Sequence, residues 1–328
     1  MKRINVLLML LFASMNLMAQ ERAENPIVTH MFTADPTARV WDDGRLYVYP
    51  STDVDPPRGC DLMDGYHVFS TDDMVNWTDH GEILHSRDVE WGREEGGFMW
   101  APDCVYKDSV YYYYFPHPTG TGKAWNDTWK IGVATSKYPE KGFKDKGYME
   151  AVGGFAMIDP NVFIGDDGQA YFYYGGGGKC EAGKLKENMI EIDGKMKDME
   201  GLEQFHEGPF VFKRKGIYYM IYPDGHDAEP IKGNQMRYAT SNKPLGPWKN
   251  QGIILDPTGC HTTHGSVVEY KGQWYLFYHN YAISGRKNLR SICFDKLFFN
   301  EDGTIQKVVQ TGSISKGKHI PAVKNPLK

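Results

Sequence analysis

The sequence predicts an all-β fold: a five-bladed β-propeller with four-stranded antiparallel blades around a central axis. Three observations predict it, namely many aromatic residues (21 Tyr, 16 Phe and 8 Trp), 36 glycines that supply turns, and one unit that recurs five times. Aromatic residues favour strands, and four short strands repeated about every 50 residues are typical of propeller blades. A β-sandwich is the alternative, but sandwiches rarely repeat one unit five times.

Each unit begins with an extended stretch, continues through a tight polar turn and enters an aromatic strand. In three copies an acidic residue precedes the turn glycine by nine positions: Asp35 and Gly44, Asp159 and Gly168, Glu207 and Gly216. Two looser copies begin at Trp100 and His264. Asp-Gly and Lys-Gly turns between such runs are the usual signature of a β-hairpin. The stretches 66–71, 131–136 and 236–241 are expected to be third strands, each leading to a fourth.

The first residues predict a secretory signal peptide over 1–20. Lys2 and Arg3 precede an apolar run from Ile4 to Met18 with a small residue at its end, which is the pattern of an export signal. The run is shorter than the roughly 20 residues that a membrane span needs, and a buried N-terminal helix is the alternative. We therefore expect an exported chain, periplasmic or extracellular, without a membrane span.

The rest of the chain is expected to form one propeller domain over residues 24–310, followed by a poorly ordered tail over 311–328. The formal net charge is −5 and no run of Lys or Arg is present, so nucleic acid is not an expected partner. A monomer is expected. The cysteines are odd in number and lack zinc-site spacing, so most are expected in the core: Cys60, Cys104, Cys180, Cys260 and Cys293.

Equivalent positions of a propeller repeat converge on its axis, so the residues that begin the five inner strands are expected to meet there: Asp35, Trp100, Asp159, Glu207 and His264. Crowded carboxylates cannot all keep ordinary pKa values. One is therefore expected to hold a proton while another stays ionised. A protonated acid and an ionised base are the two groups that hydrolyse a glycosidic bond. Taken singly, Asp35 and Asp159 precede proline and could form Asx-turns, and His264 could be a buried structural histidine.

The motifs at these positions resemble glycoside hydrolase family 43, whose arabinofuranosidase-like and xylosidase-like members are five-bladed propellers. The matching stretches occur in family order over about residues 24–310: Asn25-Pro26-Ile27-Val28, Asp35-Pro36, Trp100-Ala101-Pro102-Asp103, Ile158-Asp159-Pro160, Glu207-Gly208-Pro209-Phe210 and His264-Gly265-Ser266-Val267-Val268. One departure is Phe32-Thr33-Ala34 before Asp35, where many relatives carry an aromatic residue and proline. The departure suggests a different wall for the sugar pocket.

The resemblance implies a role for each of several residues. Asp35 corresponds to the general base, Asp159 to the orienting and pKa-tuning carboxylate, and Glu207 to the general acid. His264 corresponds to a histidine near the axis that, in many members, helps hold a calcium ion largely through water. One Ca²⁺ ion beside His264 is therefore an expected cofactor, and no organic cofactor is expected. Arg290 corresponds to an arginine that binds substrate hydroxyls.

The substrate contacts are expected from the same entrance of the propeller. Trp100, Asp103, His264 and Arg290 are the expected substrate-binding residues. One or two of five tryptophans are expected to stack on sugar, with Trp100 favoured by its place: Trp41, Trp91, Trp100, Trp125 and Trp129. The segments 85–99 and 115–129 are expected to be rim loops that narrow a groove into a pocket.

The resemblance implies an inverting glycosidase that acts on oligo- or polysaccharide, on hemicellulose or pectin side chains. An exo-acting α-L-arabinofuranosidase or β-D-xylosidase is the expected activity, and an endo-arabinanase or endo-xylanase is the alternative. Because Asp35 and Glu207 belong to the first and fourth units, they are expected to face each other across the funnel, as inversion requires. A non-catalytic, lectin-like propeller is the alternative from another class. It would need no complete acid–base set.

Overall fold

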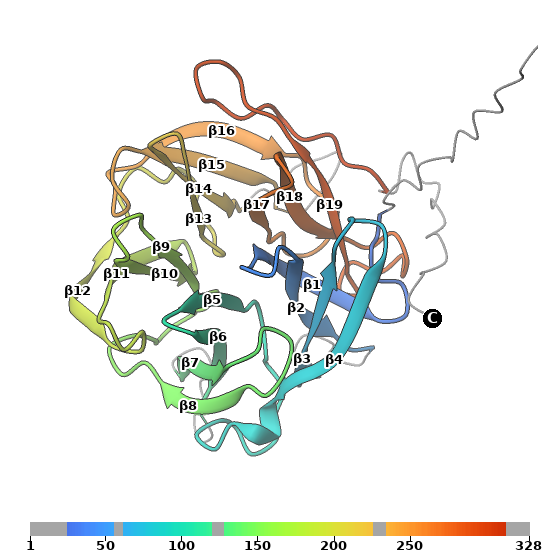
Figure 1. Cartoon of the computed structure of the whole chain (residues 1–328), viewed down its shortest axis with the longest axis vertical. Helices are drawn as coiled ribbons and strands as arrows, with labels where there is room; N and C mark the ends of the chain where they lie inside the picture. The colour runs from blue at the N-terminus through green and yellow to red at the C-terminus, as the bar shows by residue number, and fades with distance from the viewer. Residues whose placement is uncertain (1–24, 56–61, 120–127, 226–233, 313–328) are drawn as a thin grey trace, which may run out of the picture.

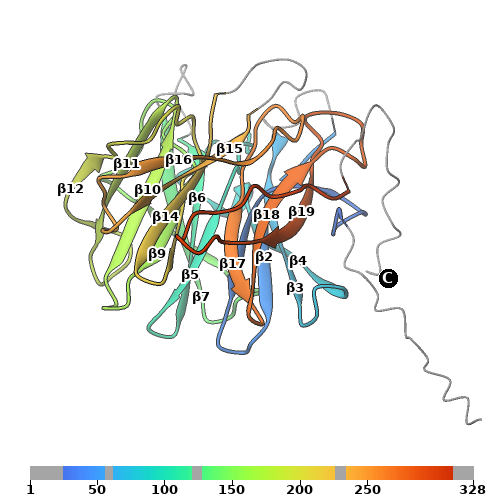
Figure 2. The ribbon, with the colours of Figure 1, turned by 90° about the horizontal axis from the view of Figure 1, so that it is seen from above.

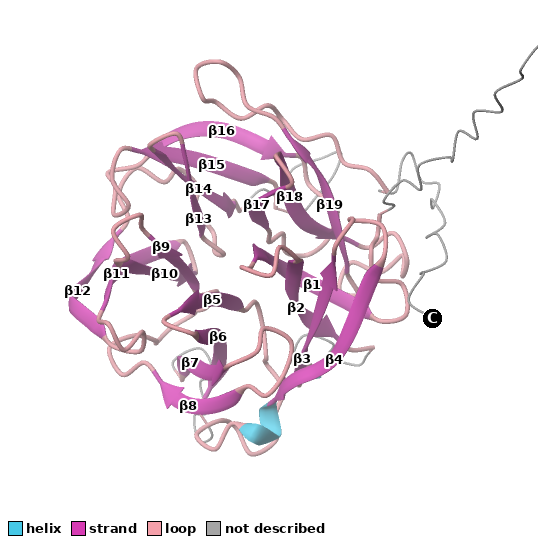
Figure 3. Ribbon diagram, viewed as in Figure 1, coloured by secondary structure: helices cyan, strands magenta, loops and turns pink. Residues whose placement is uncertain are grey.

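The computed structural model describes residues 25–55, 62–119, 128–225 and 234–312. The predicted signal peptide and nearly all of the predicted tail lie outside these residues, so export and tail disorder stay predictions. Strands dominate the described chain, and its helical residues include one short 3₁₀ turn at Ser86–Asp88 (Figure 3). None of the described residues forms a helix long and apolar enough to cross a membrane.

Five antiparallel sheets stand around a central axis, as Figure 1 shows, and they confirm the predicted propeller. The first sheet contains β1 (Phe32–Val40), β2 (Leu46–Asp53), β3 (Gly65–Thr71) and β4 (Trp77–His85). The second contains β5 (Asp103–Lys107), β6 (Val110–Pro118), β7 (Trp129–Ser136) and β8 (Lys144–Tyr148). The third contains β9 (Asn161–Ile164), β10 (Ala170–Gly176), β11 (Lys179–Leu185) and β12 (Ile192–Asp198).

The last two sheets close the ring. The fourth contains β13 (Phe210–Arg214), β14 (Ile217–Pro223), β15 (Met236–Ser241) and β16 (Lys249–Leu255). The fifth contains β17 (Ser266–Tyr270), β18 (Gln273–Asn280) and β19 (Ser291–Leu297), so in the described residues this sheet has three strands rather than four. The N-terminal segment lies along it, because the amide of Ile27 donates to the carbonyl of Ile292 at 3.0 Å. The two ends of the fold are thereby joined.

Each inner strand contacts the next one around the ring, in the order β1, β5, β9, β13, β17 and back to β1. Each runs from one face of the disc to the other, and Figure 2 shows the sheets side-on. The predicted turn glycines lie at the far ends of these strands, where Gly168 and Gly216 take left-handed φ values of 78° and 82°. Such backbone favours glycine. The opposite ends, where the inner strands begin, carry the predicted acids, and this face is called the acid-bearing face below.

The core lies between the sheets and is rich in aromatic residues, as the composition predicts. Between the first and second sheets, Tyr49, Tyr66, Tyr113 and Phe115 are completely buried in one cluster. Rings of this size each bury about 150–250 Å², so the packing of these side chains holds the facing surfaces of neighbouring sheets together. The described cysteines fill space in the same way, as free and buried thiols: Cys104, Cys180, Cys260 and Cys293.

Candidate active site

Asp35 and Asp159 reach the axis through the same local distortion. Each has a left-handed backbone, with φ values of 51° and 54°, and each is followed by proline. Asp35 lies where the register of β1 shifts between Ala34 and Thr37, and a bulge of this kind re-aims a side chain. A non-glycine residue in this conformation costs roughly 1–3 kcal/mol, and such strain clusters at functional sites. The Asp-Pro repeat therefore turns two carboxylates toward the mouth of the propeller.

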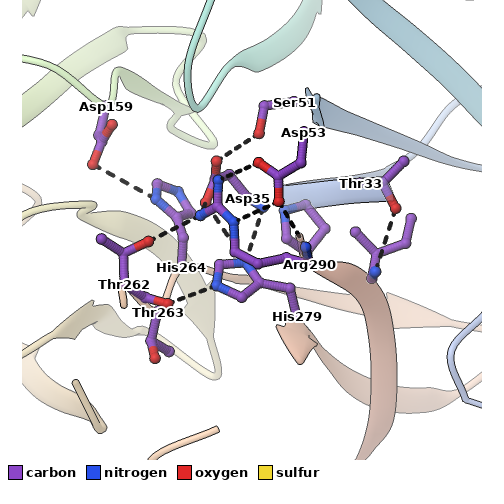
Figure 4. Close-up of polar contacts among 12 residues, drawn as sticks. Thr33, Asp35, Ser51, Asp53, Asp159, Thr262, Thr263, His264, His279 and Arg290 are labelled. Carbon is purple, nitrogen blue, oxygen red and sulfur yellow. Dashed lines mark hydrogen bonds and ion pairs between the residues drawn. The ribbon is translucent and has the colours of Figure 1, made fainter. Parts of the chain in front are cut away.

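Asp35 is held as a charged group. Its side chain is 8% exposed, and Figure 4 shows it between three partners. Ser51 Oγ donates to Oδ2 at 2.5 Å, Arg290 Nη1 donates to Oδ1 at 2.9 Å, and the backbone amide of Asp35 donates to His279 Nδ1 at 3.1 Å. Burial alone would raise the pKa of this carboxyl, but the positive charge of Arg290 and the other partners outweigh it and hold the pKa below its usual value. Asp35 is therefore ionised at neutral pH.

Arg290 is itself oriented by Asp53. Its Nε and Nη2 donate to the two oxygens of Asp53, each at 2.9 Å, and the backbone amide of Arg290 donates to Oδ2 at 2.7 Å. Nη1 also binds Thr262 Oγ1 at 2.9 Å. A two-pronged pair of this kind fixes the guanidinium plane. The visible role of Arg290 is thus to position Asp35, and its predicted contact with substrate hydroxyls stays a prediction.

Asp159 and His264 form a second charged pair at the axis (Figure 4). His264 Nδ1 lies 3.7 Å from Asp159 Oδ2, and both side chains are almost completely buried. Burial lowers the pKa of His264, but Asp159 outweighs it and the pKa is raised. Burial, together with the nearby charge of Asp35, raises the pKa of Asp159 against the pull of His264. Both groups act on the remaining acid: the charge of Asp159 raises the pKa of Glu207, and that of His264 lowers it.

Glu207 enters from the segment before β13. Gly208 allows a close approach to His264, since a Cβ at this glycine would stand 2.8 Å from His264 Nδ1. The Glu207 side chain is 15% exposed. Burial first, and then the negative charge of Asp159, raise the pKa of Glu207 to about 8. Glu207 therefore keeps its proton at neutral pH, whereas Asp35 does not.

One run of four glycines, Gly175–Gly178 at the end of β10, connects the segments that carry Asp159 and Glu207. The amide of Gly175 donates to the carbonyl of Ile158 at 2.8 Å, and the amide of Gly178 donates to the carbonyl of His206 at 3.0 Å. These carbonyls belong to the residues just before the two acids. A Cβ at Gly176 would stand 2.1 Å from the carbonyl oxygen of Ala156, so only glycine allows this approach. The glycine turn thus sets the spacing of the two acids.

The donor set does not fit a metal centre made by protein side chains. Among the described residues, no group of three or more His, Cys, Asp or Glu side chains could hold a metal ion. A calcium ion beside His264 would have this imidazole as its side-chain ligand, although calcium prefers oxygen. The expected Ca²⁺ ion stays a prediction, which elemental analysis of the purified protein checks.

Asp103 does not join the site, contrary to the expectation that it binds substrate. Its side chain is fully buried, and Arg39 Nη2 donates to both carboxylate oxygens, at 2.6 and 2.7 Å. The amide of Val162 and the side chain of Asn161 donate to Oδ2, at 2.6 and 3.0 Å. Asp103 therefore joins three inner strands and has no exposed atom to offer a sugar.

The tryptophans divide between core and entrance. Trp129 is fully buried, and its ring lies 4.6 Å from that of Trp100, which keeps part of its surface. Tyr66 ties the backbone of Trp100 to the core by donating to its carbonyl at 2.6 Å. Trp41 and Trp91 pack on core clusters, and Trp125 lies outside the described residues. Trp100 is thus the predicted tryptophan whose place suits a substrate contact.

Four residues around Asp35 escaped the sequence analysis: Ser51, Asp53, Thr262 and His279. Ser51 and Asp53 end the second strand of the first sheet, and His279 lies near the end of the second strand of the fifth. The repeat could have found them, because a second strand returns to the face from which the first began. Polar residues at the ends of two aromatic strands were therefore the available signal.

Comparisons with known proteins identify the family. The model of the family described as glycosyl hydrolases family 43 matches residues 23–305. A xylosidase/arabinosidase of Bacteroides ovatus is 34% identical over 84% of this chain and 94% of its own. The xylosidase/arabinosidase 43A of Humicola insolens is 32% identical over 85% of this chain and 98% of its own.

Solved structures share the fold. A family 43 β-xylosidase/α-arabinofuranosidase from a compost microbial metagenome, crystallised with xylotriose in a calcium-free form, is 31% identical with a TM-score of 0.78, covering 88% of this chain and 98% of its own. A family 43 enzyme from Xanthomonas citri is 33% identical with a TM-score of 0.77, covering 88% and 94%. That enzyme has also been solved with xylose and with xylotriose.

Proposed function

The chain belongs to glycosyl hydrolases family 43 and is a glycoside hydrolase of hemicellulose, and on this premise we propose that it removes terminal pentose residues with inversion. Asp35 acts as the general base, Glu207 as the general acid and Asp159 as the residue that tunes Glu207. The observation that carries this assignment is that two carboxyl groups of one site have pKa values shifted in opposite directions. The pKa of Asp35 is held below its usual value, while that of Glu207 is raised to about 8.

The two carboxyl groups then divide one reaction between them. Ionised Asp35 takes a proton from a water molecule as the water oxygen bonds to the anomeric carbon. Protonated Glu207 gives its proton to the glycosidic oxygen as the bond between that oxygen and the anomeric carbon breaks. The products are a free pentose and a shortened saccharide, and the enzyme regains its resting state when the proton moves from Asp35 to Glu207 through solvent.

The surrounding charges match this division of work. Arg290 holds Asp35 ionised and fixed in direction, and Ser51 fixes its second oxygen. Asp159 keeps the proton on Glu207 until a leaving oxygen is present, because its negative charge opposes ionisation. Once Glu207 has given up its proton, the positive charges of His264 and, more weakly, of Arg290 favour its ionised form. The site therefore suits both protonation states of the acid.

The blades that carry the two groups support inversion. Asp35 belongs to the first sheet and Glu207 precedes the fourth, which is not its neighbour in the ring. Inverting enzymes keep their carboxyl groups roughly 6.5–9.5 Å apart to admit water, whereas retaining ones hold them about 5–5.5 Å apart. Non-adjacent blades favour the wider separation. No covalent sugar–enzyme intermediate is expected.

The proposed substrates are short xylan-derived or arabinose-bearing oligosaccharides, attacked from a chain end. The names of the relatives support both β-D-xylosidase and α-L-arabinofuranosidase activity. Both sugars are pentoses of similar size, so one acid–base pair can serve them in a shared pocket.

Proton NMR of the first-formed sugar tests the proposal, with xylotriose and an arabino-oligosaccharide as substrates. The expected first product is the pentose with inverted anomeric configuration, and Glu207→Gln and Asp35→Asn are each expected to lower kcat by roughly 10²–10⁴-fold. Asp166→Asn is the matched control. Asp159 precedes strand β9, whereas the exposed Asp166 follows it, at the end that lies away from the site. First release of the retained anomer would overturn the mechanism. Saccharide binding without hydrolysis by the wild type would favour the lectin-like alternative.

A further inference from the structure

One aromatic ring stands exposed on the acid-bearing face. Phe155 is 63% exposed and lies four residues before Asp159, in the connection from β8 to β9. The other exposed aromatic side chains among the described residues, Tyr138 and Phe298, follow β7 and β19. Both strands run away from the acid-bearing face, because strands alternate in direction within each sheet. Phe155 is therefore distinguished by its place, since scattered exposed apolar residues are ordinary in themselves.

The loop that carries Phe155 is anchored rather than loose. The amide of Gly154 donates to the carbonyl of Trp129 at 3.0 Å, and the carbonyl of Ile158 accepts from Gly175 at 2.8 Å. A Cβ at Gly153 would stand 2.3 Å from the Trp129 carbonyl oxygen, so the loop presses on a fully buried residue. A ring of this size forgoes about 1.5–3 kcal/mol of stabilisation by staying in water. A loop held at both ends thus presents this ring outward as a fixed feature.

A short path connects Phe155 with the acid. Phe155 Cε1 lies 3.7 Å from where a Cβ of Gly177 would stand, and the neighbouring Gly178 donates to the carbonyl of His206. His206 Nε2 lies 3.7 Å from Glu207 Oε2, and the His206 side chain is 41% exposed. The glycine turn thus places an apolar ring and an accessible imidazole on the side of the site from which Glu207 enters.

We propose that Phe155 and His206 form a subsite for the leaving group, the saccharide from which the terminal pentose is cut. This inference rests on the proposed role of Glu207 as general acid. The acid must stand beside the glycosidic oxygen, so the next sugar of the chain lies beside it too. The C–H face of that sugar packs on the ring of Phe155, and its hydroxyl groups exchange hydrogen bonds with His206. An aromatic surface beside a few polar groups is the usual composition of a ligand site.

The subsite predicts that the enzyme distinguishes leaving groups as well as terminal sugars. Contact with the second sugar raises kcat/KM for an oligosaccharide, but it does not raise kcat/KM for a glycoside whose leaving group is small. Two substrates with the same terminal pentose separate the effects: an oligosaccharide of three residues, and the pentosyl azide, whose small linear leaving group cannot cover Phe155. The measured quantity is the ratio of kcat/KM for the oligosaccharide to kcat/KM for the azide.

Phe155→Ala is expected to lower this ratio by about tenfold, the size of one lost aromatic contact, and Phe155→Trp is expected to keep it. Tyr138→Ala is the matched control, an aromatic side chain 54% exposed at the far face, and it should leave the ratio unchanged. A ratio within twofold of wild type in folded Phe155→Ala would overturn the subsite while leaving the proposed function intact. If the wild type cleaved neither substrate, both the subsite and the proposed function would be overturned.

Discussion

Arg290 donates a hydrogen bond from Nη1 to Oδ1 of Asp35 over 2.9 Å, across 255 positions of sequence. The contact joins the residue before β19, in the last sheet, to β1, the inner strand of the first. It places the permanent positive charge of Arg290 beside a buried carboxylate, and Asp53 fixes the position of the guanidinium. The contact that closes the propeller therefore also keeps Asp35 ionised.

Arg290→Lys tests this relationship. Lysine keeps the positive charge, but its single ammonium group cannot make a bidentate pair with Asp53 and reach Asp35 at the same time. The pKa of Asp35 is expected to rise, because burial then acts against a weaker counter-charge. The acidic limb of kcat/KM against pH should move to higher pH, with a loss of about tenfold or more in kcat near neutrality. Arg286→Lys, at an exposed pair with Asp55, is the control, and an unmoved acidic limb would contradict the role of Arg290.

Asp159→Asn is expected to move the opposite limb. As the proposed general acid, Glu207 works only when protonated, so activity should fall as the pH rises through about 8, the raised pKa of Glu207. The negative charge of Asp159 contributes to that rise, so a neutral residue lets Glu207 lose its proton more readily. The alkaline limb of kcat/KM should therefore shift to lower pH. The profile of Asp166→Asn should overlay that of the wild type, and an unshifted limb in Asp159→Asn would remove its tuning role.

Gly176→Ala tests the glycine turn. The new methyl group would stand 2.1 Å from the carbonyl oxygen of Ala156, so the loop before Asp159 must move. A displacement of about 1 Å can cost roughly 10²-fold in rate, and we expect kcat to fall by about tenfold to hundredfold with little change in KM. Gly225→Ala is the control, because a Cβ there meets nothing within 4 Å. Equal kcat in the two variants would show that the turn does not set the spacing.

Asp103→Ala separates structure from substrate binding. Its removal leaves Arg39 without its carboxylate between three inner strands. Breaking a buried pair in this way typically costs about 3–5 kcal/mol, so the denaturation midpoint should fall sharply. The KM of the folded variant at low temperature should match that of the wild type. A raised KM with an unchanged midpoint would restore Asp103 to the substrate-binding residues.

The sequence by itself determined the architecture and the convergence of the acids. The nine-residue spacing from Asp35, Asp159 and Glu207 to a turn glycine recurs with the repeat. A propeller maps equivalent repeat positions onto one axis. Periodicity in one dimension therefore predicted proximity in three. The family resemblance added roles to these positions, but their spacing came from the repeat.

Only the tertiary structure decided the charge state of each acid and the partners that impose it. Ser51 and His279 contact Asp35 from the ends of second strands and across the closure of the ring, and Asp53 contacts Arg290, the charged partner of Asp35. Asp103 matches its motif yet lies fully buried against Arg39. A pKa depends on burial and on the distance to each charge, and neither can be read from the order of residues. The same letters, Asp before or after proline, thus became a carboxyl of lowered pKa, a carboxyl of raised pKa and a structural ion pair.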